Sequence, residues 1–152
     1  MPAKAAYSTH DSARAKRHFG VPTLQTPPFF PILSLLPQRA LGFVKEAYPR
    51  LFIAVFLTIF SAMWQHGEDV SNPDVLAKVL QQHFSNDEAR KILESANSAP
   101  YKQLLNDKTR EALDRGAFGC PWFFVRNSKG KEEPFFGSDR SVKISLSPYH
   151  LR

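Results

Sequence analysis

Apolar residues recur at three- and four-residue steps through the middle of the chain, which is the period of an amphipathic helix. Leu41, Val44 and Tyr48 form the first such stripe. The following segment, residues 51–64, reads LFIAVFLTIFSAMW, and its apolar side chains nearly encircle a helix. At about fourteen residues it is shorter than the roughly 20 that a membrane span needs. We therefore expect residues 51–64 to form a helix buried in the core.

Three further helices are predicted to begin at capping signals. Asn72 can cap a helix whose first residue is Pro73, a combination that suits a helix N-terminus. Ser85 and Glu88 have the spacing of a capping box, in which each side chain bonds the backbone N–H of the other residue. Ser98 can cap the third helix. The sequence thus predicts mostly helical structure over this part of the chain.

The N-terminal segment predicts one helix followed by a loop. Residues 3–19 are rich in alanine and are expected to be helical until Gly20. Residues 22–37 contain five prolines and cannot form one regular element. The first twenty residues also carry arginine and serine with a single acid, a composition found in mitochondrial transit peptides. A folded amphipathic helix is the alternative that we favour.

The pattern changes to that of a β-hairpin near the C-terminal end. Residues 121–125 are aromatic and β-branched, residues 127–130 have turn chemistry, and residues 131–136 can return as a second strand. Ser138 or Asp139 can then cap a final helix. A lone hairpin needs helices or more strands packed against it. The predicted fold class is α/β and mostly α.

Composition and charge exclude several classes of function. The chain has 152 residues, enough for one domain, and a formal net charge of +6. Arg14, Lys16 and Arg17 lie together, but the other cations are mixed with acids, so we expect no nucleic-acid partner. A solvated surface or a pocket for a small anionic ligand accounts for the charge equally well.

The cysteine and histidine positions exclude metal and disulfide chemistry. Cys120 is the only cysteine, so the chain has no internal disulfide and no CxxC pair, and an intracellular, reducing compartment is indicated. The five histidines are dispersed without the spacing of ligands, so no metal site is expected. Cys120 has no histidine near it in the sequence and is predicted to be a packed small residue rather than a nucleophile.

Two short segments flanking the predicted hairpin could form a ligand site. An X–Pro bond is the one kind that is readily cis, and a cis bond at Pro121 would present the backbone of Cys120 to a peptide-like ligand. Ser138 and Asp139, at a helix N-terminus, could hold a carboxylate and an ammonium group. Glutathione has these features. On the residues alone, a strand start at Pro121 and a simple helix cap explain the pattern equally well.

The sequence resembles a known family at these segments. GAFGCPWFFV at 116–125, followed by FFGSDR at 135–140, is similar to kappa-class glutathione transferases and to bacterial 2-hydroxychromene-2-carboxylate isomerases, both of the DsbA-like branch of the thioredoxin superfamily. PAKAAY at 2–7, ARAKRHFGVP at 13–22 and GEDVSNPDVL at 67–76 extend the resemblance in the same order. It covers most of the chain.

The resemblance implies an incomplete thioredoxin-like fold with a large helical insertion. Residues 1–20 would be a remnant of the N-terminal thioredoxin half, residues 21–115 the helical insertion, and residues 116–152 the C-terminal half with a hairpin and a short helix. The family begins with a segment like FYDxxSPYS that carries its catalytic serine. Because this sequence holds no such segment, we expect an N-terminally truncated member and assign no catalytic residue.

The resemblance also assigns residues to glutathione, the co-substrate of the family. Lys4 matches a lysine that contacts glutathione, Cys120 presents its backbone to the cysteine of the tripeptide, and Pro121 matches the cis-proline. Ser138 and Asp139 match the residues that bind the γ-glutamyl end.

The function implied is conjugation of glutathione to small electrophiles, although the missing serine segment puts the activity of this chain in question. A glutathione-dependent isomerase on the same fold and a non-catalytic fragment that binds a partner through an unpaired strand edge are the alternatives. A disulfide oxidoreductase is disfavoured because the CxxC pair is absent. The resemblance further suggests a homodimer in mitochondria or peroxisomes, without a membrane partner, although residues 149–152 form no clear peroxisomal signal.

Overall fold

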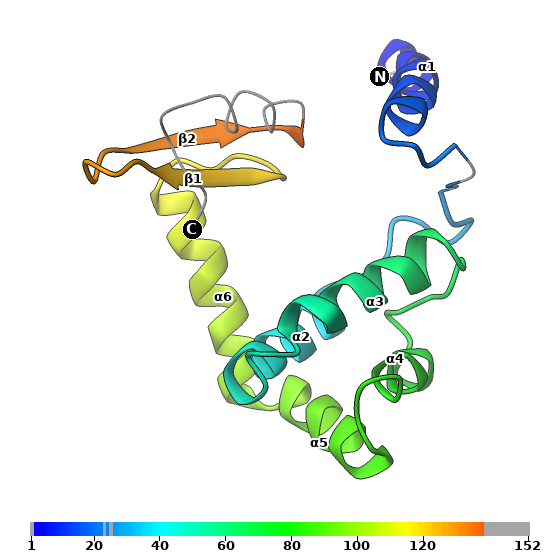
Figure 1. Ribbon diagram of the computed structural model, residues 1–152, viewed down its shortest axis with the longest axis vertical. Coiled ribbons are helices and arrows are strands. Elements are labelled where there is room, and N and C mark those ends of the chain that lie inside the picture. Colours follow the sequence, from blue (N-terminus) through cyan, green and yellow to red (C-terminus); the bar gives the residue numbers. More distant parts are fainter. Residues whose placement is uncertain (1, 23, 25, 139–152) are drawn as a thin grey trace. The chain divides into compact units, whose positions relative to one another are not determined.

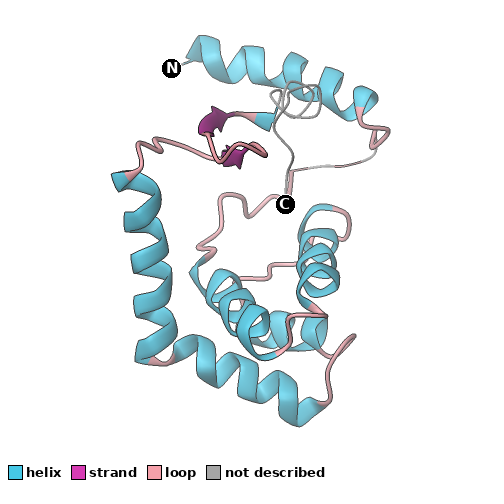
Figure 2. Ribbon diagram, turned by 60° about the vertical axis from the view of Figure 1, so that its left-hand side comes forward, coloured by secondary structure: helices cyan, strands magenta, loops and turns pink. Residues whose placement is uncertain are grey.

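The computed structural model describes residues 2–22, 24 and 26–138, which form six helices and one two-stranded sheet (Figures 1 and 2). The helices are α1 (Pro2–His18), α2 (Leu35–Ala47), α3 (Phe52–Trp64), α4 (Pro73–Leu80), α5 (Asn86–Asn97) and α6 (Ala99–Asp114); the strands are β1 (Trp122–Arg126) and β2 (Glu132–Phe136). The predicted mostly helical fold with a hairpin is confirmed. The final helix expected after residue 138 lies outside the described residues.

The chain divides into two compact units, Met1–Leu105 and Asn106–Arg152. Helix α6 contributes its first turns to the first unit and its last turns to the second. The three-part division with boundaries at residues 20 and 115 stays a prediction. None of the described helices is both long enough and apolar enough to cross a bilayer.

Helices α2 to α5 build the core of the first unit. Helix α2 packs against α5 and α3, and α4 packs against α3 and α5. The largest side chains that are fully buried there are Val44, Val55, Val70, Leu76, Leu80 and Ile92. The helical stripes expected from Leu41 to Met63 therefore supply much of this core, together with α4 and α5.

The predicted caps of α4 and α5 are confirmed. The Asn72 side chain accepts a hydrogen bond of 2.9 Å from the backbone N–H of Asp74. Ser85 and Glu88 form the capping box: the Ser85 hydroxyl accepts from the Glu88 N–H at 3.3 Å, and the Glu88 carboxylate accepts from the Ser85 N–H at 2.9 Å. The Ser85 N–H and, at 2.8 Å, the Ser85 hydroxyl both donate to the Glu88 carboxylate, and these two hydrogen bonds lower the pKa of Glu88 below its ordinary value.

The cap predicted at Ser98 is wrong in its details. The Ser98 hydroxyl donates to the carbonyl oxygen of Ser95 at 2.6 Å. It therefore bonds a backbone carbonyl in the last turn of α5 and does not cap the N–H groups of the first turn of α6. The two helices follow each other with only this residue between them. The hydroxyl therefore has a free carbonyl of the preceding helix within its reach.

The expectation that residues 51–64 form a helix buried in the core is confirmed for the helix but for only one of its sides. Val55, Ile59 and Met63 face the core, but Ile53 is 62%, Leu57 59% and Phe60 51% exposed. Helices α2 and α4 pack against α3 on the buried side. Apolar periodicity predicts that a helix can be buried; how many of its sides are covered depends on the neighbouring elements.

The hairpin of the second unit forms where it was predicted. Strands β1 and β2 are antiparallel, with Trp122 opposite Phe136 at one end of the ladder. At the other end the Asn127 side chain accepts hydrogen bonds from the N–H groups of Lys129, at 3.0 Å, and Lys131, at 2.9 Å. Gly130 closes this turn with φ +80°, a conformation that favours glycine.

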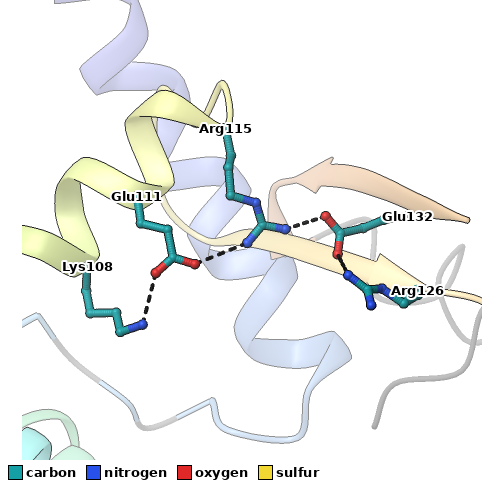
Figure 3. Close-up of polar contacts among 5 residues, drawn as sticks. All are labelled: Lys108, Glu111, Arg115, Arg126 and Glu132. Carbon is teal, nitrogen blue, oxygen red and sulfur yellow. Dashed lines mark hydrogen bonds and ion pairs between the residues drawn. The ribbon is translucent and has the colours of Figure 1, made fainter. Parts of the chain in front are cut away.

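Arg115 joins the end of α6 to the hairpin (Figure 3). Its guanidinium carbon lies 3.4 Å from the centroid of the Phe124 ring on β1. The same guanidinium pairs with Glu132 of β2 and, at 3.5 Å, with Glu111 of α6. Arg126 adds a contact of 3.3 Å to the Glu132 carboxylate. The second unit is thus held by a stacked arginine and the acids on either side of it.

Candidate functional site

The two motif segments meet at one end of the hairpin. The backbone N–H of Gly137 donates to the carbonyl oxygen of Pro121 at 3.0 Å, one step beyond the last strand pair of Trp122 and Phe136. Cys120 and Ser138 are the next residues outward on the two chains. Segments that are distant in the sequence therefore form one surface, which we call the hairpin end (residues 118–122 and 136–138).

The Cys120–Pro121 peptide bond is cis, as the family resemblance implies for Pro121. Among the described residues, none donates a hydrogen bond to the Cys120 backbone or accepts one from it. Cys120 lies outside the ladder, and its main chain can offer both an acceptor and a donor to an extended peptide.

The prediction that Cys120 is a packed residue is wrong. The residue is exposed and its thiol is free. The physical reason is its position: it precedes the first residue of β1 and lies beyond the end of the ladder, where the described part of the chain does not cover it. The described residues also contain no cluster of three or more potential metal ligands.

An aromatic ring approaches the backbone closely at Gly119. A Cβ atom at Gly119 would lie 2.9 Å from Cε2 of Phe136. The absence of a side chain thus lets the Phe136 ring lie over the backbone beside Cys120. Gly137 has φ +98°, which a residue with a side chain rarely adopts.

Three aromatic rings border the hairpin end. The centroids of Phe118 and Trp122 are 4.9 Å apart with an edge-to-face angle of 78°, and those of Phe118 and Phe136 are 4.8 Å apart. Trp122 and Phe136, which face each other across the ladder, are 6.1 Å apart. We call these three rings the aromatic cluster.

The other predicted glutathione residues are described less completely. Ser138 is exposed and is the last described residue. Asp139 lies outside the described residues. Lys4 lies in the first turns of α1, in the other unit, and its side chain is outside the described atoms. The structure therefore brings together Cys120, Pro121 and Ser138, and the roles of all five residues stay predictions.

Sequence reasoning assigned no role to Arg115, Gly119 or Gly137. Arg115 directly follows the last residue of α6. A cation near the C-terminal end of a helix is common, so the residue carries no distinctive signal in the sequence. Its contact with Phe124 depends on tertiary packing. The two glycines flank the segments that were singled out, one before Cys-Pro and one after the second strand. A glycine beside a strand can mark a place where another group lies close to the backbone, and this is the signal that these two positions offer.

Comparison with known proteins identifies the family. The family model for the DSBA-like thioredoxin domain matches residues 1–145. The chain belongs to this family. It is also similar to "Glutathione s-transferase kappa 2" of Caenorhabditis elegans, with 25% identity over 150 residues, covering 95% of this chain and 66% of the relative. This DsbA-like chain thus spans about two thirds of the length of that relative, and the resemblance drawn from the sequence is confirmed.

Proposed function

We propose that this chain binds glutathione at the hairpin end and is a glutathione transferase of the kappa type. The observation that carries the proposal is the hydrogen bond between Gly137 and Pro121. It joins the Cys-Pro segment to the Gly-Ser segment in a chain of the DsbA-like family that resembles a kappa transferase.

The proposed binding mode uses the backbone of Cys120, which has no hydrogen-bond partner among the described residues. The cysteinyl residue of glutathione adds to it as an extended strand would, through main-chain hydrogen bonds. Ser138 and Asp139 bind the γ-glutamyl end, where Asp139 pairs with the ammonium group. A role for Lys4 in binding the tripeptide is implied by the resemblance alone. Glutathione is an anion at neutral pH, and the net charge of +6 favours its approach.

The proposed reaction is attack of the glutathione sulfur on an electrophilic carbon. A C–S bond forms, the leaving group departs with its electron pair, and the thiol proton passes to water. A free thiol has a pKa near 8.5, so a transferase must stabilise the thiolate. One positioned donor is worth about 10²- to 10³-fold in rate, and we assign no residue of this chain to that role.

Calorimetric titration with glutathione tests the proposal. We expect binding by the wild-type chain and weaker binding by Asp139→Asn, because this change removes the charge that pairs with the ammonium group. Asp114→Asn is the matched control: Asp114 is an exposed acid at the end of α6, and its loss should leave the affinity unchanged. Absence of binding at millimolar glutathione, with no change in melting temperature, would contradict the proposal.

A non-catalytic role is the second candidate, and the sheet favours it. The sheet of the described residues has two strands, so each strand has one edge without a strand partner. Such edges accept an added strand from another chain. In this alternative a partner protein completes the sheet, and the titration above finds no glutathione binding.

The finer assignments rest on the resemblance alone. They are a homodimer, a location in mitochondria or peroxisomes, and the choice between transferase and glutathione-dependent isomerase. Turnover of a chromogenic electrophile in the presence of glutathione separates the two enzymes, since only the transferase consumes the thiol.

A further inference from the structure

A pocket of about 640 Å³ lies between α1 and the loop that follows it. The α1 residues that line it share one face of the helix, because positions 8, 12 and 16 and positions 9, 13 and 17 form two adjacent rows with four-residue steps. Pro22 and Thr26 line the pocket from the loop. Its volume is typical of pockets that hold small molecules.

Gly20 turns the chain at the end of α1 so that the loop comes back to the helix. Its φ of +71° lies in the left-handed region. The N–H of Gly20 donates to the carbonyl oxygen of Arg17 at 3.3 Å. The N–H of Val21 donates to the carbonyl oxygen of Lys16 at 2.9 Å. Because backbone groups already bond these two carbonyls, the side chains of Lys16 and Arg17 are not needed to cap them.

Hydroxyl groups and cations line the pocket, and the described lining residues include no acid. Four of them carry a hydroxyl and two carry a positive charge: Ser8, Thr9, Ser12, Thr26, Lys16 and Arg17. Lys16 is half-buried, and neither Lys16 nor Arg17 forms an ion pair with another described residue. Cations and hydroxyls that converge without an acid partner provide the donors that an anion needs.

The charge of α1 favours the same kind of ligand. The helix has 17 residues with four lysines and arginines (Lys4, Arg14, Lys16 and Arg17) and one acid, Asp11. Half of the net charge of +6 therefore comes from this one helix. Asp11 is not among the residues that line the pocket. The summed potential there attracts anions, and it attracts a dianion more strongly than a monoanion.

We propose that this pocket binds the phosphate monoester of a small polyhydroxyl compound, such as a sugar phosphate. The ammonium group of Lys16 and the guanidinium of Arg17 donate to the phosphate oxygens. Hydroxyls such as that of Ser12 both donate and accept hydrogen bonds, which suits the hydroxyl groups of the rest of the ligand. The proposal is independent of glutathione, because the pocket lies in the first unit and the hairpin end in the second.

Calorimetric titration of the whole chain with ribose 5-phosphate, inorganic phosphate and ribose tests the proposal. We expect ribose 5-phosphate to bind about 5-fold more tightly than inorganic phosphate, the gain of one added neutral hydrogen bond, and ribose to bind too weakly to detect. Lys16→Gln should weaken ribose 5-phosphate about 10-fold, because it removes a hydrogen bond from a charged donor. Ser12→Ala should weaken it about 5-fold, and Lys16→Arg should keep most of the affinity.

Arg14→Gln is the matched control. It removes one positive charge from the same helix, but Arg14 is exposed and does not line the pocket, so the affinity should change by less than about twofold. Circular dichroism shows whether each variant keeps its helices. Equal weakening by Lys16→Gln and Arg14→Gln would overturn the proposal, because the net charge alone would then attract the phosphate. Equal affinity for ribose 5-phosphate and inorganic phosphate, or no binding of ribose 5-phosphate at millimolar concentration, would also overturn it.

Discussion

Replacing Arg115 by alanine should loosen the hairpin that carries the candidate site. Arg115 lies between Glu111 of α6 and Glu132 of β2 (Figure 3). Its guanidinium also lies over the ring of Phe124. A cation–π contact at a partly exposed site is worth about 0.5–1 kcal/mol. Ion pairs as exposed as these contribute little. We therefore expect Arg115→Ala to lower the free energy of opening of the hairpin by about 1 kcal/mol.

Hydrogen exchange of the backbone amides measures this opening locally. A change of about 1 kcal/mol corresponds to an increase of roughly fivefold in the exchange rates of protected β1 and β2 amides. Arg126→Ala is the matched control. Arg126 contacts the same Glu132 carboxylate at 3.3 Å, but among the described residues its side chain lies over no aromatic ring. Its effect should be much smaller.

The pH dependence of the Arg115→Ala effect follows from Glu132. The hydrogen bond from Arg115 is the largest cause that holds the pKa of Glu132 below its ordinary value of 4.5. A carboxylate with a lowered folded-state pKa stabilises the fold above the unfolded pKa and loses that contribution as the pH falls through the folded value. The small part of the difference between wild type and Arg115→Ala that comes from this ion pair should therefore be lost as the pH falls below 4.5, whereas the part that comes from the Phe124 ring should remain.

Two results would refute this reasoning. Equal effects of Arg115→Ala and Arg126→Ala would show that Arg115 stabilises the hairpin through Glu132 and not through the Phe124 ring. Complete loss of the Arg115→Ala effect in 1 M salt would point the same way, because exposed ion pairs are screened at that ionic strength, whereas contact with the ring remains.

Substitutions at three further positions test the fold, two of them with a companion variant. In Gly119→Ala the new Cβ would lie 2.9 Å from the Phe136 ring and should displace it. We expect this to destabilise the hairpin by about 1 kcal/mol. Adding Phe136→Leu to this variant should restore the protection of the hairpin amides against exchange. Ser85→Ala should cost about 1 kcal/mol in urea unfolding through loss of the cap. Leu76→Ala should cost about 2–5 kcal/mol because the side chain is fully buried, whereas Leu33→Ala, at an exposed position, should change stability by less than about 0.5 kcal/mol.

Each of these expectations has a result that would contradict it. Unchanged amide exchange in Gly119→Ala would mean that the ring is not held against the backbone. If Ser85→Ala unfolds at the same urea concentration as the wild type, the capping box does not stabilise the fold. Similar losses for the buried and the exposed leucine would contradict the assigned core.

Elements with local signals could be predicted from the sequence. The caps at Asn72 and Ser85 depend on side chains that bond backbone groups two or three residues away, and the hairpin turn depends on Asn127 and Gly130. In each case the partners are neighbours in the chain. The pattern of residues was therefore sufficient to fix the interaction.

Features that depend on tertiary neighbours could not be predicted in this way. The sequence shows that α3 is apolar on most sides, but not that Leu57 and Phe60 stay exposed. It shows that Cys120 precedes a strand, but not that the ladder ends before it. The pairing of Arg115 with Phe124 brings together a helix end and a strand, and no periodicity encodes such a contact.

The candidate site was predictable in part. The Cys-Pro and Gly-Ser segments were recognised because their order resembles that of a family, and the structure joins them through the Gly137 to Pro121 hydrogen bond. The sequence alone does not predict the aromatic cluster, because its rings come from both strands and from the loop before β1. Their proximity follows from the register that sets Trp122 opposite Phe136.

The central claim is that glutathione binds at the hairpin end. An NMR titration tests it most directly: glutathione is added to the isotope-labelled chain, and the backbone amide resonances are followed. The account predicts saturable shift changes concentrated at the amides of Cys120, Trp122, Gly137 and Ser138, with small changes in helices α2 to α5. Shift changes confined to those helices, or no changes at millimolar glutathione, would contradict the account.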